Sequence, residues 1–121
     1  MLIGKVNRHA FLKSTVIAAT HVEPYEVAAR RLQIEMALMK LSAFPKVILG
    51  GDFNTSEAKQ IAEGYGYTCT SSANTPTCWF GTEIDFVFTR GLANNISVRC
   101  THPPCVGSDH LPVLVDFFIK N

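Results

Sequence analysis

The stretch KVILGGDF, residues 46–53, decides the fold class of this protein. Its apolar run predicts a strand, and an acidic residue, Asp52, follows where that strand should end. Upstream, residues 14–22 are β-branched and apolar without a helical period, so they predict a buried strand that ends near His21. A strand, a helix and a second strand in this order are typical of an α/β fold.

The segment between these two strands, residues 24–44, predicts one long amphipathic helix. Charged residues fall between apolar positions that recur at helical spacing, and these apolar positions are Ala28, Leu32, Met36 and Met39. Pro24 is acceptable in a first helical turn, and Pro45 should stop the helix. We therefore expect a long helix that packs against a sheet.

The rest of the chain predicts a short helix followed by several strands. The helix covers residues 55–66, with Thr55 or Ser56 as its cap and Gly64 as its stop. The expected strands lie within residues 78–91, 94–100 and 111–120, and the last of them should be buried. We expect a single domain, residues 1–121, with a mixed α/β or α+β fold, in which one long helix covers a mixed sheet.

Composition excludes several classes of protein. A hydrophobic fraction of 47% with 17% charged residues is that of an ordinary globular domain. Eleven basic and 10 acidic residues give a net charge of +1, which provides no broad electrostatic surface for nucleic acid or an anionic membrane. The first residues lack the continuous apolar centre of a signal peptide, and no stretch approaches the ~20 apolar residues of a membrane span. We expect a soluble protein without a membrane partner, in an undetermined compartment.

The cysteines leave their redox state open. Four are present, and they could form two disulfides in any of three pairings, or none: Cys69, Cys78, Cys100 and Cys105. Their spacing does not resemble a zinc site. Free thiols are the favoured interpretation, and Cys100 with Cys105 is the first pair to test for a bridge.

Polar residues recur at the ends of the expected strands, where layered sheets assemble ligand sites. These residues are His21, Asp52, Asn54, Asp85, Asp109 and His110. Asp85 is expensive to bury between Ile84 and Phe86 unless it is paired, and His110 would supply the partner. A carboxylate fixes the tautomer of an imidazole and raises its basicity, which makes His110 a candidate general base or phosphate ligand.

Each of these signals also has a structural interpretation. His21 alone at a strand end is more often structural or simply exposed, and Asp52 with Asn54 could build an Asx turn. Trp79 and Phe80 could stack on a nucleic-acid base, but aromatic residues next to a strand more often belong to the core.

Taken together, the motifs resemble those of the endonuclease/exonuclease/phosphatase superfamily, which includes DNase I-like nucleases. The resemblance rests on ATHVEP, R-x-x-Q at Arg30 and Gln33, VILGGDFNT, TCWFGTEIDFVF and GSDHLPVLVDF, which occur in family order. It covers the C-terminal half of the family domain, a four-layer sandwich with two sheets covered by helices. The implied activity is phosphoester hydrolysis by an activated water, with magnesium, or alternatively manganese, as the cofactor.

The resemblance implies a role for each polar residue. Asp52 would orient or deprotonate the water, and Asn54 would hydrogen-bond the phosphate or Asp52. Asp109 would be a metal ligand together with Asp52. His110, oriented by Asp85, would contact the scissile phosphate or transfer a proton.

His21 would complete this site by binding a phosphate oxygen or assisting the leaving group. The first half of the family domain contributes an Asn and a Glu that is the principal magnesium ligand, and neither has a matching motif here. One sheet face would therefore lack its normal cover, so we expect a homodimer or a complementing N-terminal half. The expected function is a metal-dependent phosphoesterase acting on a phosphate ester, with nucleic acid as one candidate; a non-catalytic remnant or interaction module is the alternative.

Overall fold

The computed structural model describes residues 1–7, 12–71 and 75–120. The elements, in chain order, are β1 (Leu2–Lys5), β2 (Val16–His21), α1 (Val27–Leu41), β3 (Val47–Asp52), α2 (Ala58–Gly64), β4 (Thr68–Cys69), β5 (Asp85–Arg90), β6 (Ile96–Thr101) and β7 (Leu114–Ile119). The first five strands form one mixed sheet in the order β1-β2-β3-β5-β4, while β6 and β7 pair with each other. The expected mixed α/β fold is thus confirmed.

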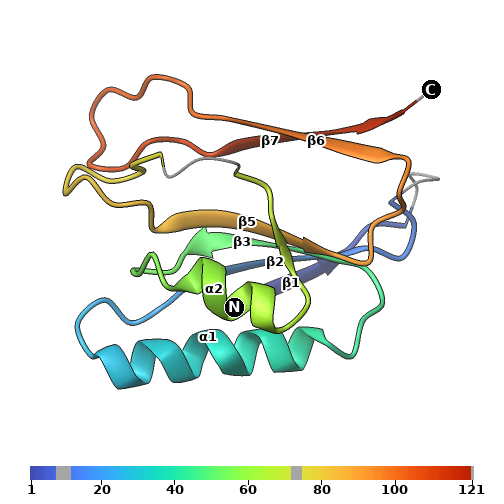
Figure 1. Ribbon diagram of the computed structural model, residues 1–121, viewed down its shortest axis with the longest axis horizontal. Coiled ribbons are helices and arrows are strands. Elements are labelled where there is room, and N and C mark those ends of the chain that lie inside the picture. Colours follow the sequence, from blue (N-terminus) through green and yellow to red (C-terminus); the bar gives the residue numbers. More distant parts are fainter. Residues whose placement is uncertain (8–11, 72–74, 121) are drawn as a thin grey trace.

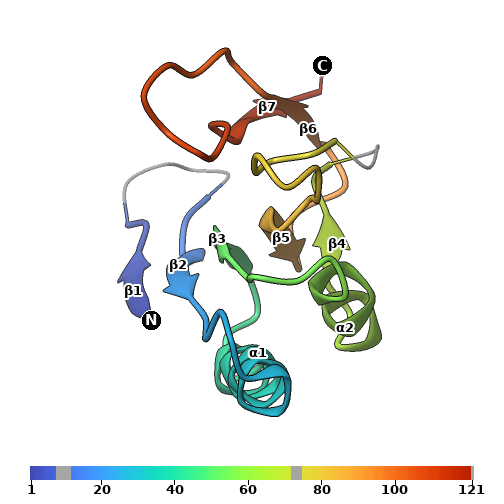
Figure 2. The same ribbon diagram turned by 90° about the vertical axis from the view of Figure 1, so that its left-hand side faces the viewer.

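Three layers are visible in the molecule (Figures 1 and 2). Helices α1 and α2 cover one face of the five-stranded sheet, and the two-stranded β6–β7 ribbon lies across the opposite face. The core fills the space between the sheet and the helices; its largest fully buried side chains include Ile34, Leu38, Leu41, Leu49, Phe53 and Phe88.

Alternation along the strands decides which side chains join this core. In β2, Val16 and Ala18 are buried against the helices, so Ile17 and the terminal His21 point to the other face. Strand β3 runs parallel to β2 with α1 as the crossover, and it is antiparallel to β5. The sheet face that looks away from the helices therefore carries the polar strand ends.

Helix α1 packs through a different face from the one that its sequence pattern indicates. The expected apolar stripe is exposed, with Leu32, Met36 and Met39 at 56%, 59% and 60%. The buried positions are Ile34, Ala37, Leu38 and Leu41, which have the same helical spacing. Two polar contacts hold the helix in this rotation. The Gln33 side chain accepts the Glu23 N–H at 2.8 Å, and Arg30 donates to the Asn54 carbonyl oxygen.

Two further expectations about burial and capping are wrong. Strand β7 is only partly buried because it lies in a two-stranded ribbon with one free edge rather than inside a sheet. Neither Thr55 nor Ser56 is the N-cap of α2; that position is Glu57, which makes no side-chain cap hydrogen bond. Thr55 instead accepts the Glu57 N–H through Oγ1 at 3.2 Å.

The short strands β1 and β4 have too few residues for a sequence pattern, and neither was predicted. All four cysteines are free thiols, so the expected free state holds and no bridge joins Cys100 to Cys105. The polar composition of TSSANTPT, residues 70–77, predicts a loop, and residues 72–74 of it lie outside the described part of the chain. Neither helix in the described ranges combines the length and hydropathy needed to cross a membrane.

Candidate functional site

Sheet register brings three of the predicted polar residues into one row. His21 is the Cα partner of Asp52 in the β2–β3 pair, and Asp52 is the partner of Asp85 in the β3–β5 pair. All three therefore occupy equivalent positions on adjacent strands and point to the same sheet face. This row lies where β2 and β3 end and β5 begins, at one end of the sheet (Figure 1).

His110 reaches this row from the loop that precedes β7. Its backbone pairs with Cys78 in an isolated antiparallel bridge, and its N–H donates to Ser108 Oγ at 3.1 Å. The loop is thus held by the backbone on both sides of the imidazole. The sequence places His110 directly before a strand, whereas the strand begins only at Leu114.

The imidazole of His110 lies between two carboxylates. Its Nδ1 is 2.8 Å from Asp85 Oδ2, and its Nε2 is 3.9 Å from Asp52 Oδ2. Because an ionised carboxylate only accepts hydrogen bonds, the proton is on Nδ1 and is donated to Asp85. In the neutral ring, Nε2 then presents a lone pair toward Asp52 and the open side of the cluster.

His21 and Asn54 both meet Asp52, but in different ways. His21 Nε2 is 3.5 Å from Asp52 Oδ2, and its side chain is 72% exposed. Asn54 adopts a left-handed conformation with φ 51°, and its backbone N–H donates to Asp52 Oδ1 at 2.8 Å, which forms the Asx turn. The Asn54 amide donates to the Val22 carbonyl oxygen at 2.9 Å, so it ties β2 to the turn after β3.

Thr77 holds the site together and is not among the site residues predicted from the sequence. It is fully buried, and its Oγ1 accepts the backbone N–H groups of Ile84 and Asp85 at 3.0 and 3.1 Å. Its carbonyl oxygen accepts the Leu111 N–H at 2.8 Å. One hydroxyl residue therefore links the start of β5 to the His110 loop, and the only sequence signal is a Thr directly before the CWF motif.

The electrostatic environment favours the protonated form of His110. The hydrogen bond to Asp85 raises the pKa of the imidazole above its usual value of 6.5, and the negative charges of Asp85, Asp52 and Asp109 act in the same direction. Partial burial acts in the opposite direction. The net result is that His110 holds its proton more tightly than a free imidazole does.

We expect Asp85→Asn to lower the pKa of His110, because the variant removes the largest cause of the elevation. A group whose pKa is higher in the folded state than in the unfolded state stabilises the protein when it is protonated. This stabilisation is complete below the unfolded pKa, about 6.5, and it is lost as pH rises through the folded pKa. The stability difference between parent and variant should therefore shrink from pH 6 toward pH 8. NMR titration of the imidazole in the presence of a chelator measures the shift. Asp109→Asn is the control and should have a smaller effect; equal pKa values in the parent and Asp85→Asn would refute the assignment.

Asp52, Asp85 and His110 also form the one cluster, within the described ranges, that offers three potential metal ligands. One ligand atom from each lies within 4.8 Å of the others. Asp109, expected as a metal ligand, is outside this group. It is exposed and directly precedes His110 in the same loop. The structure therefore brings together Asp52, Asp85 and His110, with His21 at the edge.

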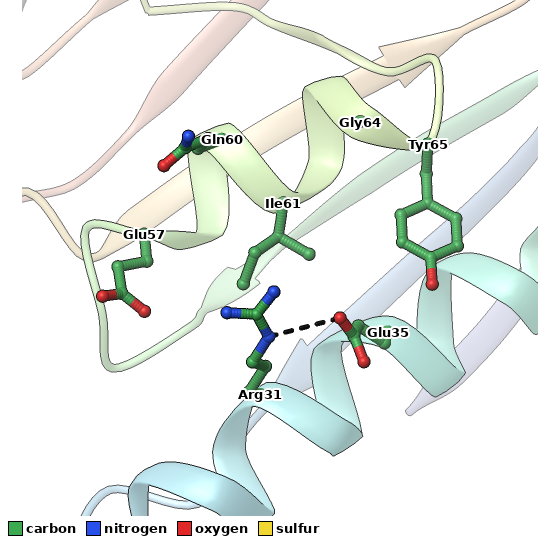
Figure 3. Close-up of a pocket in the computed structure, with 7 residues that line it drawn as sticks. All are labelled: Arg31, Glu35, Glu57, Gln60, Ile61, Gly64 and Tyr65. Atoms are coloured by element: carbon green, nitrogen blue, oxygen red, sulfur yellow. Dashed lines mark hydrogen bonds and ion pairs between the residues drawn. The ribbon is translucent and has the colours of Figure 1, made fainter.

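Two cavities bear on the choice of site. One of about 360 Å³ opens directly beside the cluster, and its lining includes Gly50, Gly51, Asp52, Asp85, Leu111 and Val113. The other, of about 350 Å³, lies between α1 and α2 on the helical side (Figure 3). There Arg31 is already paired with Glu35 at 3.3 Å, and Glu57 adds a further negative charge. The first cavity is lined by two members of the cluster, Asp52 and Asp85, so it is the candidate site.

Comparison with known proteins identifies the family of the chain. The sequence pattern of the Endonuclease/Exonuclease/phosphatase family matches residues 10–110. The chain belongs to this family. The endonuclease/exonuclease/phosphatase superfamily consists of hydrolases that act on phosphate esters, and the matched residues include every predicted site residue. No curated protein sequence matches the chain.

Solved structures share the fold of this family member. The human Nocturnin catalytic domain with a bound sulfate anion has a TM-score of 0.63 at 17% identity, covering 88% of this chain and 47% of its own. Truncated Caenorhabditis elegans TDP2 has a TM-score of 0.64 at 17% identity, and the match covers 96% of this chain and 57% of the TDP2 chain. A Bacteroides thetaiotaomicron mannosyl-6-phosphatase has a TM-score of 0.60 at 16% identity, and the match covers 87% of this chain and 50% of the phosphatase chain. The chain therefore spans about half the length of the structures it matches.

Proposed function

We propose that this chain hydrolyses phosphate esters through a water molecule activated at the cluster of Asp52, Asp85 and His110, with a divalent cation as cofactor. The observation that carries the proposal is the position of His110, 2.8 Å from one carboxylate and 3.9 Å from a second, in a member of a phosphoesterase family. The mannosyl-6-phosphatase among its structural relatives is an example of such chemistry on the same fold.

Each residue has a role that follows from its contacts. Asp52 is the acceptor for a proton of the attacking water, because its Oδ2 faces both imidazoles and its Oδ1 is held by the Asn54 N–H. Protonated His110 donates from Nε2 to a phosphate oxygen and stabilises the negative charge that develops there. Asp85 orients this ring through Nδ1. His21, at the exposed edge, contacts a phosphate oxygen or the leaving group.

The donor set fits a cation such as magnesium or manganese. These hard ions prefer oxygen ligands and are often held by one or two carboxylates together with water and substrate phosphate. Asp52 has a side-chain exposure of 20%, and Asp85 is engaged by His110, so Asp52 is the better ligand, with Asp109 as the nearby exposed carboxylate. A bound cation would neutralise phosphate charge and lower the pKa of a coordinated water.

A second polypeptide completes the fold in this proposal, as a second copy of the chain or as a complementing N-terminal half. The chain spans about half of its relatives, and the β6–β7 ribbon covers the second sheet face only partly, since Ile17 there is 45% exposed. Sedimentation should show a homodimer. A monodisperse monomer would contradict the homodimer and favour the complementing half.

The test is hydrolysis of bis(4-nitrophenyl) phosphate and of single-stranded DNA, with magnesium or manganese. Turnover should disappear in a chelator and return when the metal is restored. Isothermal calorimetry should also detect cation binding that depends on Asp52. Absence of both turnover and cation binding would contradict the proposal and favour the second candidate, a non-catalytic interaction module of the same fold.

A further inference from the structure

Trp79 and Phe80 occupy the centre of a turn on the surface. The turn is closed by the Gly81 N–H, which donates to the Cys78 carbonyl oxygen at 3.0 Å. Both aromatic side chains are exposed, at 71% and 73%, which corrects the expectation that they belong to the core. Turn centres usually hold Gly, Pro, Asn, Asp or Ser, so turn formation does not explain two large aromatic residues there.

The two rings contact each other. Their centroids are 4.5 Å apart with an interplanar angle of 38°. Neither residue belongs to the buried cluster that forms the core. Exposing two aromatic rings to water costs free energy in proportion to their exposed apolar area. Packing within the described chain does not offset this cost. The exposed area is therefore available to a ligand.

Backbone hydrogen bonds hold this turn against the candidate site. The Trp79 N–H donates to the Asp109 carbonyl oxygen at 2.9 Å, and the preceding Cys78 pairs with His110. On the other side, Thr77 fixes the start of β5 at Asp85. The aromatic pair thus begins one residue after the bridge that positions the imidazole, on a turn that backbone hydrogen bonds tie to the His110 loop.

We propose that Trp79 and Phe80 form a stacking platform for an unpaired nucleobase of single-stranded nucleic acid. The inference rests on the proposed function, since it places the phosphate next to that base at His110. An aromatic face binds bases of any sequence. The net charge of +1 provides little general attraction for phosphates, so stacking supplies much of the affinity. Bases within a duplex are already stacked, which makes single strands the preferred ligand.

The single tryptophan of the chain makes the test direct, because fluorescence excited selectively at tryptophan reports Trp79 alone. The full chain is titrated in a chelator, which prevents turnover, with an oligothymidylate of eight nucleotides. Two matched probes are an abasic oligomer of the same length and a duplex. The oligothymidylate should quench the emission and bind about tenfold more tightly than either matched probe.

Variants separate stacking from general binding. Phe80→Ala keeps the fluorescent probe and should weaken oligothymidylate binding about fivefold to tenfold without changing the affinity for the abasic oligomer. Trp79→Ala, measured by anisotropy of a labelled oligomer, should do the same. Phe118→Ala is the control, since this ring is 41% exposed in β7 and lies over Arg99, and it should leave binding unchanged.

Three outcomes would overturn the inference while leaving the proposed function intact. Equal affinity for the abasic oligomer and the oligothymidylate would mean that phosphates alone are recognised. Emission that does not change with oligothymidylate would mean that no base reaches Trp79. Emission shielded from iodide in the free protein would mean that another polypeptide covers the rings. Metal-dependent hydrolysis of bis(4-nitrophenyl) phosphate by the parent chain, and by Phe118→Ala at the same rate, would confirm an intact catalytic site in each case.

Discussion

Asp52→Asn is expected to lower kcat/KM for phosphodiester hydrolysis at least about 100-fold, because it removes the acceptor for the water proton while preserving the shape of the side chain. No other side chain of the cluster has as many partners. Its Oδ1 accepts the Asn54 N–H, and its Oδ2 faces both His21 and His110. The amide of Asn cannot act as a base. It can also place an N–H₂ group in the position of Oδ2, which faces the two imidazoles in the parent.

The measurement is a comparison of initial rates for the parent, Asp52→Asn and a matched surface variant, Asp116→Asn. Asp116 is also a paired carboxylate, 3.1 Å from Arg99, but it lies in the β6–β7 ribbon away from the cluster, so its variant should retain the parent rate. Circular dichroism should show that both variants fold. Parent-like turnover by folded Asp52→Asn would rule out its role in water activation.

Gly51→Ala is expected to lower the free energy of unfolding by about 3 kcal/mol or more, because a Cβ at this position would overlap the backbone of β2. The added atom would meet the carbonyl oxygen of Thr20 at a distance that no real contact permits, and backbone cannot move aside as a flexible side chain does. Gly51 also directly precedes Asp52. Separation of β2 from β3 would therefore break the His21–Asp52 pair and reduce activity as well.

Gly50→Ala is the matched control, one residue earlier in the same strand. Its Cβ would lie 3.6 Å from a Val87 methyl group and 3.8 Å from the Phe86 carbonyl oxygen, which are ordinary van der Waals contacts. Its effect should stay within about 1 kcal/mol. Urea unfolding followed by circular dichroism measures both. Equal stability of the two variants would show that the close approach of β2 and β3 does not depend on Gly51.

The polar residues of the site could be predicted from sequence because each one is out of place in its local context. Asp85 follows Ile84 in an apolar run, and Asp52 closes a strand of branched side chains. Buried carboxylates require partners, so an acid in such a run predicts an ionic or hydrogen-bonded contact. That contact exists, as the 2.8 Å pair of Asp85 with His110.

Periodicity, by contrast, left the orientation of α1 undetermined. The helix carries two apolar stripes of equal spacing, and the sequence favoured the one that is exposed, with Met36 and Met39. Contacts from distant segments decide between them, because Arg30 and Gln33 bind groups near the strand ends. Hydrophobicity alone cannot distinguish two such faces.

What the sequence determined by itself was the order of the two helices and the longer strands, without β1 and β4, and the residue types gathered at the strand ends, since both depend on local pattern. Only the tertiary structure decided the register that aligns His21, Asp52 and Asp85, the hydrogen bonds of Thr77, and the exposure of Trp79 beside the site. Each of these depends on contacts between segments far apart in the chain, and such contacts follow from the packing of whole layers rather than from any short stretch.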